Sequence, residues 1–483
     1  MILVTLLLIP AGAAGVIALL RHRRAMEVIH GLAALATLGT GLAVAVRVWH
    51  GRTEITGLGY LLRADALSAL MVAIVTVLGA IAAIYGLGYI RVEFDAARTP
   101  RARLFFSLSQ VFMFTMLLAV TTDNLGVMWV AIEGTTLATV FLVNLHNTRT
   151  SLEAAYKYLI LSSVGIALAF VGTVLMYYAG AARSGEIAVN WTSLYAAASS
   201  LNPQVVRLAF AFILVGYGTK AGLAPMHTWL PDAHSEAPAP ISALMSGVLL
   251  NVGLYALMRF TAVVNLTLGA SFSSRLLMGV GLLSLAVASA FLLTQRNYKR
   301  MLAYSSVEHM GIICLGLGFG GYWGVFGALL HVINHALSKS LLFMLSGNIL
   351  LKYRTTDIGR VRGLLRASPI IGGAFLAATV ALVGLPPFGL FMSEFIIFRA
   401  GLESHAWVAV IGIALLVVVF AGMLASVNHM LYGEPPDTLA GGEVPSWSMA
   451  PLAVNFALLI AFGLTLPLAV ADAVKQAIRV LGG

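Results

Sequence analysis

The chain has few charged residues and almost no cysteine. Only 10% of its 483 residues are charged, against roughly 25% in soluble domains. Its single cysteine, Cys314, excludes a disulfide framework and any cluster held by several cysteine ligands. The sequence contains no glycine-rich phosphate loop, nucleotide fingerprint or catalytic triad. We therefore expect no catalytic centre, no cofactor and no metal in this chain, and no electron transfer through it.

Apolar residues make up 60% of the chain and form runs along its whole length. Runs of about 17–25 apolar residues are long enough to cross a bilayer as helices. The first run lacks a positive segment in front of it, so we expect a retained span rather than a cleaved signal. The pattern predicts one all-α polytopic membrane domain over residues 1–483, with about fourteen transmembrane helices near 1–20, 26–46, 66–90, 104–121, 124–145, 157–180, 206–230, 240–260, 276–294, 301–320, 323–351, 369–398, 406–431 and 450–472.

The net charge of +10 is the usual consequence of positively charged cytoplasmic loops in a membrane protein. We therefore expect a lipid bilayer and not nucleic acid as the partner of these charges. Loops after the odd-numbered runs carry most of the lysines and arginines. This bias predicts that those loops are cytoplasmic and that both termini lie outside.

Two of the expected helices contain a proline break next to an ionisable residue. Lys220 precedes Pro225 in the seventh, and Glu394 follows the pair Pro386 and Pro387 in the twelfth. Interrupted helices at matching positions of two halves are typical of transporter sites. Because five helices separate the two breaks, the second half would be inverted relative to the first. We expect two inverted five-helix repeats, helices 4–8 (104–262) and 9–13 (275–431), with helices 1–3 (1–103) before them and helix 14 (450–472) after them.

Ionisable residues inside membrane spans are costly and usually functional. Glu133 lies among threonines in VMWVAIEGTTLATVF, and Lys220 lies in a long apolar run. A structural carboxylate bonded to hydroxyls, or a structural ion pair between Glu133 and Lys220, is the alternative. The proton affinity of a lysine changes when a carboxylate approaches or leaves, so the sequence favours a proton-carrying pair.

The segment HVINHALSKSLLF carries three polar residues at a spacing of four. His331, His335 and Lys339 would share one face of a helix over about 12 Å. Histidine can take a proton on one ring nitrogen and release one from the other. A zinc site would also use His at i and i+4, but the motif offers no third ligand. A satisfied core stripe remains an alternative, and the pattern favours a proton path.

Several further polar residues lie near these groups. Glu394 is expected to end the proton path or to pair with a buried cation. Glu308 with His309 fits an interfacial ion pair as well as a functional site, and His227 with Asp232 fits either a gate or a helix cap. Asn251 cannot titrate and can only hold geometry or relay through water. The accessory candidates are Lys157, His227, Asp232, Asn251, Glu308 and His309.

Five segments together resemble the antiporter-like subunits of respiratory complex I and of multisubunit cation/proton antiporters. They are EAAYKYLILSSVG, GTKAGLAPMHTWLPDAHSEAPAPISALMSGVLL, KRMLAYSSVEHMG, HALSKSLLFMLSGNIL and GLPPFGLFMSEF. The resemblance covers about residues 60–430 and implies fourteen helices, two inverted repeats and a central polar axis. The glutamate before His309, with SKSLLF and YRTTDI, is most similar to component F of membrane-bound hydrogenase 4 complexes.

The resemblance implies roles for individual residues. Glu133 and Lys220 match the glutamate and lysine of helices 5 and 7, and Glu394 matches the exit residue of helix 12. His331, His335 and Lys339 match the bridging group of helix 11. Asn251 departs from the lysine that some relatives have in helix 8, which puts a relay through that position in doubt.

The implied function is proton translocation by a membrane subunit of a redox complex. Its partners would be other antiporter-like and small helical membrane subunits, with a peripheral arm that holds a nickel-iron hydrogenase or a similar enzyme. The implied location is the cytoplasmic (inner) membrane of a bacterium or archaeon. A subunit of a multisubunit Na⁺/proton antiporter and a non-conducting structural subunit are the alternatives.

Overall fold

The structure is a computed structural model that describes residues 1–94, 99–184, 189–437, 439 and 446–482. Within these ranges nearly all regular structure is helical. A short antiparallel hairpin pairs Ile55 with Ala64 and lies between α2 and α3. The elements are α1 (Ile2–Leu19), α2 (Arg23–Gly51), β1 (Ile55–Gly57), β2 (Leu62–Ala64), α3 (Ala66–Glu93), α4 (Thr99–Thr121), α5 (Leu125–Val143), α6 (Arg149–Ser184), α7 (Trp191–Ala196), α8 (Pro203–Lys220), α9 (Trp229–Glu236), α10 (Ala239–Leu244), α11 (Leu250–Leu268), α12 (Ala270–Leu292), α13 (Tyr298–Phe319), α14 (Gly321–Tyr353), α15 (Leu364–Ala367), α16 (Pro369–Leu382), α17 (Gly389–Ser404), α18 (Ala406–Leu431), α19 (Met449–Leu464) and α20 (Leu468–Val480).

The chain is an all-α polytopic membrane protein. Eleven helices of the described residues are long and apolar enough to cross a membrane, or twelve if α19 and α20 count as one bent span. The expected seventh and twelfth helices correspond to two broken pairs, α8 with α9 and α16 with α17. Both expected breaks are therefore confirmed. The division into inverted repeats and the total of fourteen spans stay predictions.

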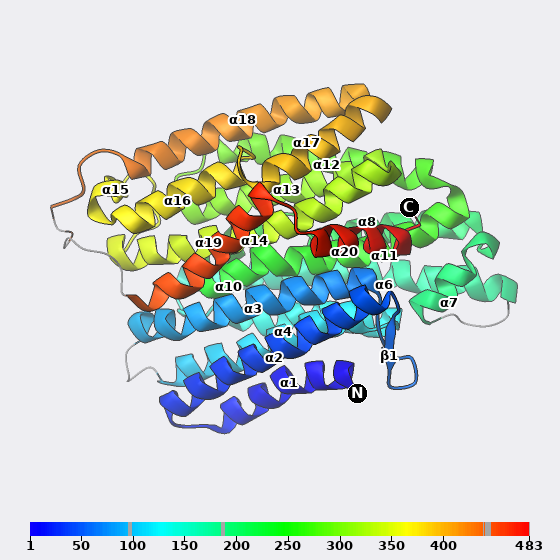
Figure 1. Cartoon of the computed structure of the whole chain (residues 1–483), viewed down its shortest axis with the longest axis horizontal. Coiled ribbons are helices and arrows are strands. Elements are labelled where there is room, and N and C mark those ends of the chain that lie inside the picture. Colours follow the sequence, from blue (N-terminus) through cyan, green and yellow to red (C-terminus); the bar gives the residue numbers. More distant parts are fainter. Residues whose placement is uncertain (95–98, 185–188, 438, 440–445, 483) are drawn as a thin grey trace.

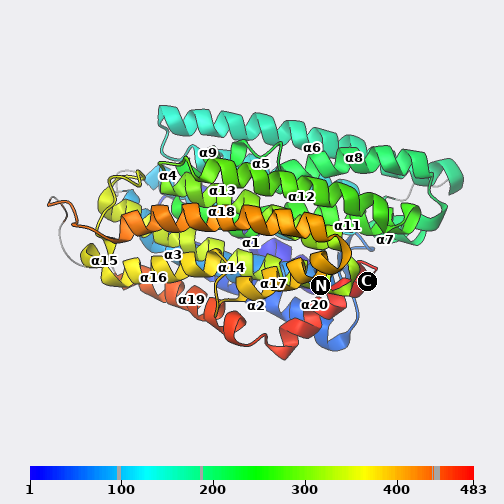
Figure 2. The same cartoon turned by 90° about the horizontal axis from the view of Figure 1, so that it is seen from above.

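The long helices lie side by side (Figure 1), with α1 and α2 along one edge and α17 and α18 along the opposite edge. Viewed from above, α6 and α8 form a further edge (Figure 2) and pack on each other. At the centre, α14 packs against α3, α10, α13 and α17. Any polar side chain on α14 is therefore enclosed by protein on most sides.

Helix starts in this chain have local causes. Asp65, Asn124 and Asn297 precede α3, α5 and α13, and the side chain of each accepts a hydrogen bond from a backbone N–H of the first turn. Asn202 does the same before α8, where Pro203 occupies the first turn. These side chains satisfy N–H groups that a helix leaves without partners at its start.

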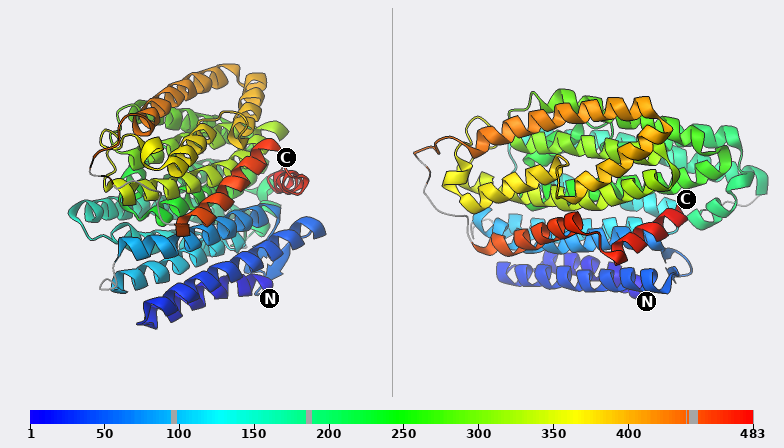
Figure 3. Two further views of the ribbon diagram at one scale, coloured as in Figure 1. Left: turned by 60° about the vertical axis from the view of Figure 1, so that its left-hand side comes forward. Right: turned by 45° about the horizontal axis from the view of Figure 1, so that its top comes forward.

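The helix expected at 450–472 is bent in the structure. The helix ends at Leu464, and α20 leaves at an angle of 76° after Pro467 (Figure 3). Proline has no N–H to continue a helix, and α20 buries an apolar face while its charged residues stay exposed. Its Ala473, Val474, Ala477 and Ile478 are buried, while Lys475 and Arg479 are exposed. This two-faced helix packs against α2, α3 and α14.

Candidate functional site

The first break exposes backbone groups in the interior of the protein. After Lys220 the chain passes through Gly222, which has a φ of 75° that favours glycine, and reaches Pro225. The indole N–H of Trp229 donates to the backbone carbonyl of Thr219 at 2.9 Å. This bond satisfies one of the carbonyl groups that have no partner within the helix at the end of α8. Lys220 is the last residue of α8 and is fully buried.

A threonine links Lys220 to Glu133. The ammonium of Lys220 donates to the hydroxyl of Thr136 at 2.7 Å and to that of Tyr158 at 3.1 Å. Thr136 donates onward to Glu133 at 3.0 Å, and Ser163 donates to the other carboxylate oxygen at 2.8 Å. The expected direct ion pair is thus replaced by a hydroxyl bridge. The sequence offered a signal for it, because Thr136 lies one turn after Glu133.

Asn251 lies on the segment that connects the two halves of the site. A π-helical turn at Met245–Leu249 precedes Asn251. The side-chain amide of Asn251 donates to the carbonyl of Gly247 at 2.8 Å. Two residues on, Gly253 packs against the backbone of Ala221 so closely that a side chain would not fit. The carbonyl oxygen of the Asn251 amide is buried without a partner among the described residues. The segment therefore joins the Lys220 break to the central helices.

Lys339 bonds to α13. Its ammonium donates to the carbonyl of Leu302 at 2.8 Å and to the hydroxyl of Ser305. Glu308, one turn along α13, is buried and interacts electrostatically with Lys339. Glu308 therefore lies among the buried groups of the site and faces Lys339, and its functional role stays a prediction.

The histidines of α13 and α14 form a group that Ser393 of α17 extends. His309 and His331 share a hydrogen bond of 2.9 Å between ring nitrogens, and the other nitrogen of His331 lies 3.0 Å from the hydroxyl of Ser393. The ring centroid of His335 is 5.3 Å from that of His309. Both nitrogens of His335 are buried without a partner among the described residues. The expected stripe along α14 is therefore interleaved with His309 of α13.

Glu394 lies against the second break. Its carboxylate fills the place of the missing side chain at Gly384, which has a φ of 68°. Asn334 of α14 donates to the carbonyl of Gly389 at 2.9 Å and fixes the start of α17. One oxygen of Glu394 has no hydrogen-bond partner among the described residues. Each break thus has one buried ionisable residue beside it, Lys220 before the first break and Glu394 after the second.

Three of these residues form a group that could hold a metal ion. One ligand atom from each of His309, His331 and Glu394 lies within 4.8 Å of the others. The third ligand that the α14 motif lacks is therefore supplied by another helix. A ring nitrogen of His309 and one of His331 lie 2.9 Å apart, so the two rings can also share one proton.

The accessory residues Lys157, Asp232 and His227 lie at the end of the bundle near α9. Lys157 bridges Asp232 at 3.1 Å and Glu153 at 2.7 Å, and Arg300 also pairs with Asp232. A ring nitrogen of His227 lies 3.2 Å from the carbonyl of Pro225. These residues tie α6, α9 and α13 together at one end of the site, separate from the buried line of Lys220, Lys339 and Glu394.

A buried ion pair at the opposite end was missed by the sequence reasoning. Arg259 of α11 binds both oxygens of Asp65 at 2.6 and 2.7 Å and stacks on Trp191 and Tyr255. Burial alone would raise the pKa of Asp65, but Arg259 and then Arg63 lower that pKa to about 2. Arg259 is the lone charged residue of an apolar run, and this pattern could have indicated a buried ion pair.

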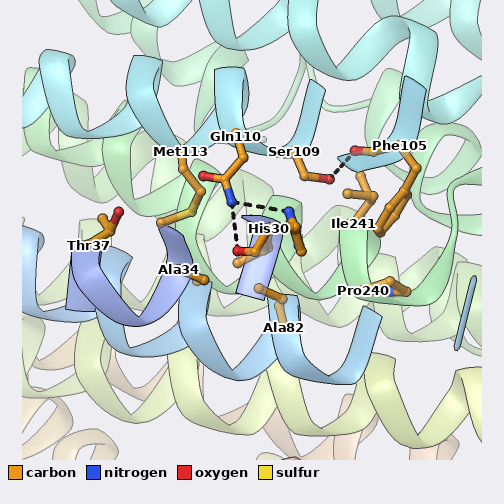
Figure 4. Close-up of a pocket in the computed structure, with 13 residues that line it drawn as sticks. His30, Ala34, Thr37, Ala82, Phe105, Ser109, Gln110, Met113, Pro240 and Ile241 are labelled. Carbon is orange, nitrogen blue, oxygen red and sulfur yellow. Dashed lines mark hydrogen bonds between the residues drawn. The ribbon is translucent and has the colours of Figure 1, made fainter. Parts of the chain in front are cut away.

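A second missed group surrounds His30 of α2. Gln110 of α4 reaches one ring nitrogen of His30 at 3.1 Å and its backbone carbonyl at 3.2 Å (Figure 4). The other ring nitrogen and the hydroxyl of Thr37 are buried without partners among the described residues. Both residues line a cavity of about 20 Å³. That space suits about one ordered water.

Comparisons with known proteins agree with this architecture. Residues 122–421 match the family described as NADH:quinone oxidoreductase/Mrp antiporter, TM. The chain is 38% identical to the Hydrogenase-4 component F homolog of Methylacidiphilum infernorum over 83% of this chain and 85% of that one. It is 32% identical to NADH-quinone oxidoreductase subunit N of Desulforudis audaxviator over 86% of this chain and 83% of that one.

A solved structure of an archaeal respiratory membrane complex, the membrane-bound sulfane sulfur reductase, contains a similar chain. The TM-score is 0.88, with 24% identity, and the match covers 99% of this chain and 97% of that one. At this identity the likeness supports the fold alone.

Proposed function

Because this chain belongs to the NADH:quinone oxidoreductase/Mrp antiporter transmembrane family, we propose that it is a proton-translocating subunit of a multi-subunit redox complex. The observation that carries the proposal is a line of polar side chains beside and between the two helix breaks, most of them buried and ionisable. We call this line the polar axis; its members are the partly buried Glu133, the amide Asn251, and the buried ionisable residues Lys220, Lys339, Glu308, His309, His331, His335 and Glu394. Ionisable groups are retained inside a membrane only where they have a role.

The Lys220 break gives the polar axis one movable connection. In this structure the ammonium is held by Thr136 and Tyr158, and Thr136 connects it to Glu133. If the ammonium releases these hydroxyls, its proton can pass toward Asn251, whose free amide oxygen accepts a hydrogen bond from a bridging water. A change of the electric field at one end of the polar axis would shift the equilibrium between the ammonium held by Thr136 and Tyr158 and the ammonium released toward Asn251.

The second half of the polar axis offers proton carriers at short intervals. His309 and His331 are already hydrogen bonded, and Ser393 extends that chain toward the second break. His335 lies between them and Lys339 along α14. Its unpartnered ring nitrogens, and that of His309, are sites where ordered waters complete a proton path. Glu394 would then receive the proton at its free oxygen.

Partner subunits are supported by the position of Glu133. This carboxylate is only partly buried and lies on the face of α5 and α6 that carries exposed apolar residues such as Val130, Leu137 and Ile160. A charged group on a lipid-facing surface is costly, so a neighbouring membrane subunit would cover it. Since the chain has one cysteine and no cofactor motif, electron transfer would take place in a peripheral arm. Similarity to a hydrogenase-4 component favours a nickel-iron hydrogenase or a similar enzyme there.

The membrane orientation follows from the loop charges. Both termini would lie outside the cytoplasmic membrane of a bacterium or archaeon, because the loops rich in lysine and arginine face the cytoplasm. Protons would then move from the cytoplasmic end, near Asp232, toward the outside. Fusion of a cytoplasm-active reporter to the C-terminus should give no signal in this orientation.

A cation/proton antiporter subunit is the second candidate. The family includes Mrp antiporters, and His309, His331 and Glu394 offer three ligand atoms that could hold a cation. Measurements of proton movement by the intact complex in liposomes distinguish the candidate functions. Acidification that is driven by redox turnover and unaffected by Na⁺ supports the proton-pumping subunit. Proton movement that requires Na⁺ and no redox turnover supports the antiporter, and equal pumping with or without an intact polar axis supports a structural subunit.

A further inference from the structure

An apolar cleft opens between α2 and α19. Both helices pack on α3, and α3 and α14 form the floor of the cleft. Its lining includes Leu42 and Trp49 of α2, Ile74 of α3, Leu337 of α14 and Phe462 of α19. Figure 1 shows α19 crossing the helices of the floor obliquely. The cleft has a volume of about 210 Å³, and apolar side chains line it.

A space of this kind is unstable when it is empty. Protein interiors hold few voids larger than a water molecule, and apolar cavities take up apolar guests rather than water. Leu42 at the rim is 39% exposed, so the cleft communicates with the lipid side of α2. The stretch from Leu42 to Trp49 extends about 10 Å along the helix axis. An alkyl chain from the surrounding bilayer has the shape and the polarity of this space.

One end of the cleft carries positive charge. Val470 of α20 also lines the cleft, and Gln476 of α20 donates to the backbone carbonyl of Trp49 at 3.1 Å, which holds α20 beside the Trp49 end. Arg479 lies one turn beyond Gln476 and Arg52 lies three residues beyond Trp49, and both side chains are exposed. Neither guanidinium forms an ion pair within the described residues. Lys475 of α20 pairs with Asp472, so among the described residues Arg52 and Arg479 are the unpaired positive charges at this end. Exposed basic side chains at a membrane surface attract anionic headgroups.

We propose that this cleft binds an anionic phospholipid of the bilayer, with one acyl chain along α3 and the phosphate at Arg52 and Arg479. The deep end of the cleft reaches Ala336 and Leu337, directly after His335 on α14. A bound acyl chain therefore keeps water away from the back of α14 and confines hydration to the side of the histidines. This binding site is independent of whether the polar axis conducts protons.

The test uses the full-length chain in native membranes supplied with phosphatidylglycerol that carries a diazirine on one acyl chain. Photolabels, located by peptide mass spectrometry, should concentrate on the cleft segments of α2, α3 and α19. The variant Ala73→Phe fills the lining, and we expect about tenfold less label there, the change that a loss of 1.4 kcal/mol produces. Ala36→Phe, on an exposed face of α2 outside the cleft, is the matched control and should label like the wild type.

The headgroup is tested by competition. Unlabelled phosphatidylglycerol should displace the probe more effectively than phosphatidylcholine, and Arg479→Gln should reduce this preference about fivefold, since one basic residue near anionic lipid contributes about 1 kcal/mol. Arg24→Gln, at the other end of α2, should leave the preference unchanged. Even labelling over all lipid-facing helices, no effect of Ala73→Phe, or recovery of a quinone instead of phospholipid from the cleft would overturn the proposal.

Discussion

The hydroxyl of Thr136 is the point at which the proposed mechanism is most open to test. It accepts a hydrogen bond from Lys220 at 2.7 Å and donates one to Glu133 at 3.0 Å. Thr136→Val removes the hydroxyl and keeps the shape of the side chain. Tyr158 remains as a partner of Lys220 and Ser163 as a partner of Glu133. The change therefore cuts the connection and leaves each charged group with one remaining hydrogen bond.

The expected loss of proton translocation in Thr136→Val follows from the hydrogen bonds that the substitution removes. A hydrogen bond to a charged group contributes about 1.5–3 kcal/mol, which corresponds to about a 10- to 150-fold change in an equilibrium. The weaker of the two bonds limits the coupling between Lys220 and Glu133. We therefore expect proton translocation to fall about 10-fold or more in Thr136→Val. Thr76→Val in α3, a buried threonine that bonds only to its own helix, should have a small effect.

A double-mutant cycle separates a bridge from a direct contact. If Glu133 acts on Lys220 through Thr136, then Glu133→Gln should have almost no further effect in the Thr136→Val background. The measurement is the initial rate of acidification by the intact complex in liposomes, with electron transfer to an artificial acceptor as the control for assembly. Effects that multiply in the double variant would refute the bridge and favour direct action of Glu133 through space.

Four further outcomes follow from the structure. Lys220→Ala should leave assembly intact and abolish translocation in the same liposome assay, and pumping at the wild-type rate would show that Lys220 is not a carrier. His335→Leu should also stop translocation, because it removes the middle proton carrier, whereas Asn251→Lys should alter but not abolish it; unchanged pumping by His335→Leu would place the route away from α14. Asp65→Asn should lower folding stability at pH 7 by about 2 kcal/mol, since the pKa of Asp65 falls from 3.8 to about 2 on folding. That contribution is present above pH 4 and is lost as the pH falls toward 2, so thermal unfolding in detergent should show the two proteins converging in acid, and a constant difference would contradict the linkage.

Much of the architecture was predictable because its causes are local. The length of an apolar run decides whether a helix can cross a bilayer, and the missing N–H of Pro225 or Pro387 decides where a helix breaks. Buried ionisable residues stand out in such runs without any knowledge of their neighbours, as Lys220, Lys339 and Glu394 did. Pro467 also breaks a helix, but the apolar residues that continue into α20 concealed the bend.

The partners of those residues were decided only by the tertiary structure. Arg259 and Asp65 are separated by 194 positions, and no spacing rule connects them. His309 meets His331, and Thr136 stands between Lys220 and Glu133, because of how each helix is rotated and packed against its neighbours. A hydrogen bond requires its atoms within about 3 Å of each other. Many weak packing contacts along whole helices together determine such a placement, so the sequence alone determined which groups are present and the packed bundle decided which of them touch.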